Sequence, residues 1–361
     1  MKNKKMMIWI VLAVLGAVAV FLAGSYLMVH GYYMKMNIDD GNEVYGKDQL
    51  SNNAMSYEAG PEYEEEEAAG PDSDQADINA LEDAIRINMK SNAEEIEGEG
   101  DVFNILLIGC DTRQEGGTGR ADSIILISIN KKQEKIVATS IMRDIYVEIP
   151  GYGNNRINAA YAYGGADLLM ETIEKNFKIE INRYASADFF VFMDIVDQIG
   201  GVEMEVSDEE ARVMNGYIND LNFILGEAKD TDCLKGGGTY LLNGKQALGY
   251  SRIRYVGNAD FERTQRQRNI LEQIFLEIKD CNLIELNSLL NKILPEVTTD
   301  LTEGETITLA LGMSSYGKYE LVQSRVPYDG TYRSMRIRGM AVLGIDFEEN
   351  IRNMKRDIYQ I

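Results

Sequence analysis

Histidine is almost absent from this chain, which has one, His30, among 361 residues. A Ser-His-Asp triad or a multi-histidine metal site is therefore close to excluded. The three cysteines (Cys110, Cys233 and Cys281) are too few for a disulfide scaffold or a CxxC zinc site. Any chemistry must come from Asp, Glu, Arg, Lys, Ser, Thr, Tyr and backbone groups.

Basic charge is also scarce, because the net charge is -22. This excess of acid argues against a nucleic-acid-binding protein with a broad basic surface. The charge is unevenly spread: residues 1–30 hold three lysines and no acid, whereas residues 31–100 hold four basic and 19 acidic side chains. These blocks, with the remaining residues 101–361, are a first outline of the domains.

The first block contains a long hydrophobic run, residues 6–29, with no charged side chain. At about 1.5 Å per residue it spans roughly 36 Å as a helix, enough to cross a bilayer. Lysines precede it, so the positive-inside rule places residues 1–5 in the cytoplasm and the rest of the chain outside, as a single-pass protein of the cell membrane. A cleaved signal peptide is the alternative, but its apolar region is normally shorter.

The second block, residues 30–100, is predicted to be an acidic extracytoplasmic linker. Residues 34–78 include four consecutive glutamates and few large apolar groups, so we expect them to be disordered. They act either as a tether or as a solvated linker with no further role. Apolar spacing at Ile78, Leu81, Ile85 and Met89 predicts a short amphipathic helix over 79–93.

The third block, residues 101–361, mixes strand and helix patterns without an internal repeat. Several strands are apolar throughout, which is typical of a sheet covered on both faces. We therefore predict one three-layer α/β/α domain. The expected strands are 103–109, 123–129, 135–142, 202–206, 319–326 and 340–345; the expected helices are 168–177 continuing through 191–199, 263–279, one from a Thr302–Glu305 capping box through 311, and one from Asp346.

Acids and arginines gather on the loop between the first two expected strands. Asp111 and Asp122 can share a hard cation such as Mg²⁺. Arg113 and Arg120, on the same glycine-rich loop, can bind phosphate oxygens in a bidentate manner. The alternative is a loop of surface salt bridges.

Further arginines follow the third strand and surround the long helix. Arg143 comes directly after the third strand. Arg252 and Arg254 are two residues apart and share a face on an extended segment, and Arg263 and Gln267 share a helix face. Together they would make an anion-binding hollow. For Arg266 and Arg268, on the same helix, we expect an ordinary solvated face.

Six segments in order resemble the LytR-CpsA-Psr family: LLIGCDTR, GRADSIILISI, SIMRDIYVEIP, RINAAYAYGG, VDQIGGVEMEV and ALGYSRIRYVGNADFERTQRQR. The resemblance covers about residues 101–350. The departures are small: Met142 replaces a usual proline, Arg156 a common lysine and Glu262 a common glycine.

The resemblance implies an envelope phosphotransferase with a lipid pocket in its core. Such an enzyme moves a phosphoglycan, a teichoic-acid-like or capsular polymer, from polyprenyl pyrophosphate to peptidoglycan. Apolar residues such as 189–192 would line the pocket or form plain core. The resemblance further implies these roles: Asp111, Arg120 and Asp122 catalytic, Asp111 and Asp122 also binding Mg²⁺, and Arg113, Arg143, Arg252, Arg254, Arg263 and Gln267 binding pyrophosphate.

Two other functions remain open. One is a membrane-bound attenuator or scaffold that binds polyprenyl lipid and transfers nothing. The other is a pyrophosphatase acting on the same lipid. No nucleic acid is expected as a partner.

Overall fold

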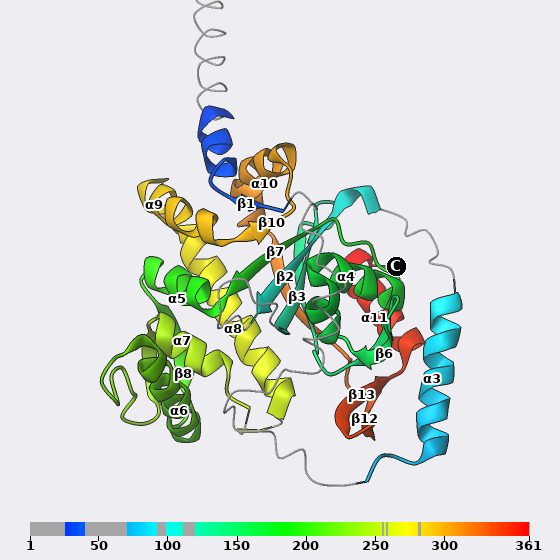
Figure 1. Ribbon diagram of the computed structural model, residues 1–361. Helices are drawn as coiled ribbons and strands as arrows, with labels where there is room; N and C mark the ends of the chain where they lie inside the picture. The colour runs from blue at the N-terminus through cyan, green and yellow to red at the C-terminus, as the bar shows by residue number, and fades with distance from the viewer. Residues whose placement is uncertain are drawn as a thin grey trace, which may run out of the picture.

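The computed structural model describes residues 26–39, 71–91, 99–110, 120–254, 256–257, 259–280 and 283–360. They form a mixed α/β fold around a seven-stranded sheet (Figure 1). The strands lie in the order β1 (Asn37–Ile38), β10 (Thr298–Thr299), β7 (Arg183–Asp188), β2 (Val102–Cys110), β3 (Ala121–Asn130), β4 (Lys135–Ile141) and β11 (Glu320–Val326).

The central strands pair in both directions. β2 is antiparallel to β3 and parallel to β7, β3 is antiparallel to β4, and β4 is parallel to β11. Side chains alternate across a strand, and in β2 Leu106 and Ile108 point into the main hydrophobic core while Ile105 and Leu107 are only half-buried. The two faces of the sheet therefore have different surroundings.

One face is covered by α3 (Gln75–Lys90), α4 (Ala159–Phe177) and α11 (Phe347–Tyr359), together with two hairpins. The hairpins are β5–β6 (Tyr146–Ile149 and Gly153–Arg156) and β12–β13 (Tyr332–Ile337 and Met340–Ile345). Leu81 and Ile85 of α3 lie in the same core cluster as Leu169 of α4 and Ile358 of α11. This face is closely packed.

The opposite face carries a second helical group, on the left of Figure 1. It comprises α5 (Phe189–Gln198), α6 (Asp208–Leu225), α7 (Gly244–Ser251), α8 (Ala259–Asp280) and the hairpin β8–β9 (Val202–Val206 and Gly238–Leu242). Its own core contains Val202, Met214, Ile218 and Ile270. This group therefore has a hydrophobic core separate from the main one.

The described N-terminal segment, residues 26–39, docks on α9 (Leu283–Ile293) and α10 (Glu303–Tyr316). Residues 26–33 are helical, His30 Nδ1 lies 2.7 Å from Glu303 Oε1, and the Tyr32 hydroxyl donates to Asn287 Oδ1 at 2.7 Å. β1 then adds to the sheet edge beside β10. This segment is therefore fixed to the folded body at several points.

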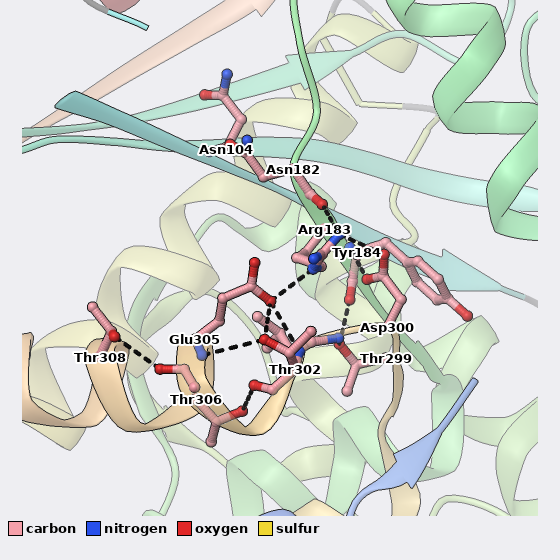
Figure 2. A network of polar contacts seen from close by, with 12 residues as sticks. Asn104, Asn182, Arg183, Tyr184, Thr299, Asp300, Thr302, Glu305, Thr306 and Thr308 are labelled. Carbon is pink, nitrogen blue, oxygen red and sulfur yellow. Dashed lines mark hydrogen bonds and ion pairs between the residues drawn. The ribbon is translucent and has the colours of Figure 1, made fainter. Parts of the chain in front are cut away.

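A polar network fastens β10 and α10 to β7 (Figure 2). Asp300 Oδ1 accepts the backbone N–H of Tyr184 at 2.7 Å, and Arg183 Nε donates to Glu305 Oε2 at 2.7 Å. Glu305 also accepts from the backbone N–H of Thr302, whose hydroxyl accepts the Glu305 N–H. The predicted capping box is thus confirmed.

Two expectations about secondary structure were wrong. The helix expected to continue to residue 199 is interrupted by β7, whose segment RYASAD lacks the apolar run of the other central strands. Of the spacer expected to be disordered over 34–78, the described residues contribute β1 and the start of α3, which begins at Gln75. Pairing with β10 and burial of Ile78 supply the stability that composition alone did not indicate.

Within the described ranges, no helix is long and apolar enough to cross a membrane. Most of the predicted anchor, residues 6–25, lies outside those ranges. So do residues 40–70 and 92–98 of the predicted linker.

Candidate functional site

The space between the sheet and the second helical group is a cavity of about 600 Å³. That volume is typical of a small-molecule site. Its floor is made by strands, with Leu107 from β2, Ile125 from β3 and Ala185 and Ala187 from β7. Because the side chains of β7 at the floor are small, they leave room in the cavity for a ligand. The sequence pattern did not predict this strand.

Apolar side chains from the helices form the roof of the cavity. Phe189, Phe192 and Ile195 come from α5, and Ile270, Leu271 and Ile274 come from α8. On α6, Tyr217, Asp220 and Ile224 lie at i, i+3 and i+7 and so share one face. Of the aromatic run 189–192, two phenylalanines line the cavity, Val191 is buried and Phe190 is 40% exposed.

Five of the predicted site residues line this same cavity at its polar end. They come from β3, from the segment after α7 and from α8: Asp122, Arg252, Arg254, Arg263 and Gln267. The cavity thus combines apolar walls with three arginines and one amide, and its three carboxylates are Asp122, Asp188 and Asp220. Such a site suits a ligand that has an apolar body and an anionic head.

Arg143, a sixth predicted residue, reaches the cluster through Asp122. Its Nη1 donates to Asp122 Oδ1 at 2.6 Å, and its Nε lies 3.5 Å from Asp144 Oδ2. Asp144 in turn pairs with Arg156 of β6 at 3.4 Å. This alternating chain of charges, with every side chain less than a quarter exposed, orients Arg143 toward the polar end of the cavity.

The Asp122 carboxyl is ionised because of its neighbours. Burial by itself would raise its pKa, but Arg143, Arg263 and Arg254 outweigh burial and hold the pKa of Asp122 below its usual value. At neutral pH this carboxylate therefore accepts hydrogen bonds but is a poor acceptor of a proton.

Arg252 is positioned by aromatic rings. Its guanidinium lies 5.1 Å from the centre of the Phe189 ring and 5.1 Å from that of Tyr217. Cation–π contacts of this kind are worth about 0.5–2 kcal/mol each. They hold the guanidinium at the wall of the cavity and leave its N–H edges available for an anion.

Three predicted site residues remain, and the structure describes only one of them. Arg120 is exposed, directly before β3 and two residues from Asp122. Asp111 and Arg113 lie outside the described residues. Among those described, no group of three or more His, Cys, Asp or Glu side chains is arranged to hold a metal ion.

The expectation for Arg266 and Arg268 was wrong, since both are buried, at 4% and 5% exposed. Arg266 donates to Glu210 at 2.9 Å and Glu262 at 3.0 Å, so Glu262, the departure from the family pattern, has a structural partner. Arg268 bonds to amide oxygens of Gln265 and Gln323. α8 packs against β8 and α7 on one side and β4 on another, which leaves little of it solvated.

Sequence reasoning missed α6 and α7, and with them Tyr217 as a cavity residue. The signal for α6 was present: Ser207 and Glu210 form a capping box in which the Ser207 hydroxyl accepts the Glu210 N–H at 3.2 Å. A capping box before an apolar 3.6-residue repeat marks a helix start.

Comparisons with known proteins show what this chain is similar to. The LytR_cpsA_psr family model matches residues 71–357. A relative from Enterococcus faecalis, a polyisoprenyl-teichoic acid–peptidoglycan teichoic acid transferase TagU, is 33% identical over 222 residues, 60% of this chain and 67% of the relative. The regulatory protein MsrR of Staphylococcus aureus is 30% identical over 66% of this chain and 68% of its own length.

Solved structures are similar as well. TagT bound to LI-WTA has a TM-score of 0.58 and 26% identity, with 74% of this chain and 94% of that chain covered. The family protein YwtF (TagT) with bound octaprenyl pyrophosphate lipid has a TM-score of 0.55 and 25% identity over the same shares. The match of the family model across most of the chain shows that this protein belongs to the LytR_cpsA_psr family.

Proposed function

We propose that this protein is a membrane-anchored phosphotransferase of cell wall biogenesis. It transfers a phosphoglycan, a teichoic-acid-like or capsular polymer, from polyprenyl pyrophosphate to peptidoglycan outside the cell. The observation that carries the proposal is the single cavity that joins an apolar wall to an arginine cluster. The printed names of TagU and of TagT with octaprenyl pyrophosphate support it.

In this proposal the prenyl tail occupies the apolar part of the cavity, between the strand floor and α5 and α8. The pyrophosphate lies at the polar end against Arg252, Arg254 and Arg263, with Gln267 donating a neutral hydrogen bond. Planar guanidinium groups suit phosphate oxygens because they donate two parallel hydrogen bonds. The arginines also stabilise the charge that moves to the leaving phosphate during transfer.

The reaction is displacement at the glycan-side phosphorus. An acceptor hydroxyl oxygen forms a bond to that phosphorus, the bridging P–O bond breaks, and polyprenyl phosphate leaves with the electron pair. The hydroxyl proton passes to a base. Asp122 is unsuited to this role because its arginine neighbours keep its pKa low. Asp111 remains the predicted base.

The described residues fit Mg²⁺ only in company with the substrate. Asp122 supplies one carboxylate, and its Oδ1 already accepts a hydrogen bond from Arg143. Protein-bound Mg²⁺ commonly uses one or two carboxylates plus substrate phosphates. Asp122 with the predicted ligand Asp111 would hold the ion, which when bound neutralises phosphate charge.

The two alternatives differ in their products. A scaffold or attenuator releases nothing; one relative, MsrR, is named a regulatory protein. A pyrophosphatase releases polyprenyl phosphate with or without an acceptor. The test is product analysis of a synthetic polyprenyl-pyrophosphate glycan, with and without a peptidoglycan oligomer, on the full-length chain in detergent. We expect a glycan–peptidoglycan product and acceptor-dependent release of polyprenyl phosphate.

Two variants connect this activity to the cavity. Ala185→Phe should fill the floor and weaken binding of octaprenyl pyrophosphate, whereas inorganic pyrophosphate should still bind. Arg263→Ala should weaken both. Lys175→Gln, on an exposed side chain far from the cavity lining, is the matched control. Acceptor-independent release of polyprenyl phosphate, or no release at all, would overturn the proposal.

A further inference from the structure

The predicted membrane anchor, residues 6–29, continues into the described N-terminal segment, which is fixed to the folded body. One residue beyond the anchor, His30 Nδ1 lies 2.7 Å from Glu303 Oε1 of α10. Three residues beyond it, the Tyr32 hydroxyl donates to Asn287 Oδ1 of α9 at 2.7 Å. At about 1.5 Å per helical residue, these contacts hold α9 and α10 within about 5 Å, along the helix axis, of the end of the anchor.

This distance is short compared with the headgroup layer of a bilayer. The hydrocarbon core is about 30 Å thick and the whole bilayer about 40–45 Å, which leaves about 5–8 Å of headgroups on each side. The anchor, at roughly 36 Å, is about 6 Å longer than the hydrocarbon core, which places its last turn, Tyr26–Val29, in the headgroup layer. Side chains of α9 and α10 beside this turn therefore reach the headgroups.

α9 presents a large apolar side chain next to the N-terminal segment. Ile284, Asn287 and Asn291 lie at i, i+3 and i+7 and so share one face of α9. The two asparagines accept hydrogen bonds from Tyr32 and Lys35 of the segment. On the same face Ile284 is 82% exposed, so its apolar surface is available to lipid at the end of the anchor.

The exposed face of α10 is uncharged. Among the described side chains of this helix, the exposed ones share one face at i, i+4, i+7 and i+11: Gly304, Thr308, Leu311 and Ser315. Leu311 is 68% exposed. From Thr306 to Tyr316 the sequence has no charged residue, although 26% of the whole chain is charged. The water-facing side of a surface helix is normally polar or charged, so this face suits a membrane interface better than water.

We propose that the N-terminal segment, α9 and α10 form a membrane-contact surface that lies in the headgroup layer, with Ile284 and Leu311 in contact with lipid. This inference rests on the membrane anchor of the proposed function. In Figure 1 the surface is at the top of the molecule, where α9 and α10 lie below the blue helix on either side of it. The helices α6 and α7 and the hairpin β12–β13 lie toward the opposite end.

The membrane-contact surface gives the catalytic cavity a direction. Two apolar lining residues lie close to α9: Ile195 belongs to α5, which packs on α9, and Val297 lies between α9 and β10. α8 leads into α9, and along α8 Ile274 of the apolar lining is about 16 Å closer to α9 than Arg263. The prenyl tail would then lie on the membrane side, and the pyrophosphate would be lifted away from the headgroups for transfer.

The test is quenching of tryptophan fluorescence by lipids brominated near the headgroup end of their acyl chains, with the full-length chain in vesicles. Trp9, the single tryptophan, lies in the predicted anchor, so the wild type tests the anchor by itself. In a Trp9→Phe background, Ile284→Trp and Leu311→Trp should each lose about half of their fluorescence or more, because interfacial side chains lie about 5–10 Å deep.

The matched control is Tyr152→Trp, on the turn between β5 and β6. Tyr152 is 46% exposed but lies outside the membrane-contact surface, so this variant should lose less than about a tenth of its fluorescence. Circular dichroism checks that each variant is folded, which we expect because the replaced side chains are all exposed.

Three outcomes would overturn the inference. Unquenched Ile284→Trp and Leu311→Trp variants beside a quenched wild type would place α9 and α10 in water and leave the anchor intact. Stronger quenching of Phe223→Trp, whose side chain on α6 is 87% exposed, would turn a different face to the bilayer. An unquenched wild type would refute the anchor, and the surface with it, whereas the transfer assay would still decide whether the protein is a transferase.

Discussion

Replacing Asp122 by Asn should expose how much the arginine cluster depends on one negative charge. The carboxylate accepts from Arg143 at 2.6 Å and is the acid on which Arg254 and Arg263 also act. The Asp122 and Arg143 side chains are 21% and 11% exposed, so solvent screens the pair only weakly. Breaking a buried pair by removing one partner costs about 3–5 kcal/mol. Because Asn keeps a hydrogen-bond acceptor, we expect a loss near the lower end, about 3 kcal/mol.

The same pair predicts how this loss depends on pH. The pKa of Asp122 is lower in the folded than in the unfolded chain, so its contribution to stability is fully present above about pH 4 and is lost as pH falls through the folded-state pKa. Urea unfolding at pH 7 should therefore separate the wild type from Asp122→Asn by about 3 kcal/mol, and the difference should shrink at pH 3. Asp83→Asn breaks an exposed pair with Arg86 and should cost at most about 1 kcal/mol at either pH. A difference that does not change between pH 7 and pH 3 would refute this reasoning.

Three more predictions concern Arg266, Arg120 and the membrane topology. Arg266→Met should lower the free energy of unfolding by about 3–5 kcal/mol, because it leaves Glu210 without its buried partner. Arg212→Met, which breaks the exposed pair with Glu209, should lower it by less than about 0.5 kcal/mol, and equal losses would contradict the burial assigned to Arg266. Arg120→Ala should lower the rate of glycan transfer about 10²–10³-fold with normal circular dichroism, if Arg120 contacts the reacting phosphate; a change below threefold would remove it from the site. A reporter that is active only outside the cytoplasm, fused after Ile361, should be active; an inactive fusion at full expression would refute the predicted topology.

Local patterns predicted six of the thirteen strands that the structure describes, because those segments are apolar enough to be recognised one at a time. β2, β3, β4, β8, β11 and β13 lie within two or three residues of the expected bounds. β7 was not recognisable in this way, since Arg183–Asp188 is short and rich in small and polar residues. Its position is fixed by partners far away in sequence, β2 on one side and β10 on the other. β1 was missed for the same reason, because two residues become a strand only by pairing with β10.

The sequence predicted the charged residues of the site and their grouping, but not the side chains that pack around them. Spacing alone put Arg263 and Gln267 on one helix face, and both do line the cavity. Nothing local indicated that Arg252 would lie between Phe189 and Tyr217, since these come from three separate elements. The prediction that Arg266 is solvated was wrong for the same reason. Whether a helix face is solvated or buried depends on what packs on it, and here the partner is Glu210 of α6, a helix that was not predicted.

The contacts that the sequence did not predict are the ones that shape the candidate site. Three features make this acidic α/β protein a candidate transferase. They are the small side chains of β7 at the floor of the cavity, the aromatic pair around Arg252, and the burial of α8 on several sides. Each depends on contacts between distant segments. The arginines would be a diffuse charged surface if α8 were solvated all round. Since α8 is clamped by Arg266 on one side, it presents Arg263 and Gln267 to the cavity in a fixed register. Stability of α8 and affinity for an anion should accordingly be coupled, so that Arg266→Met weakens pyrophosphate binding without touching the cavity lining.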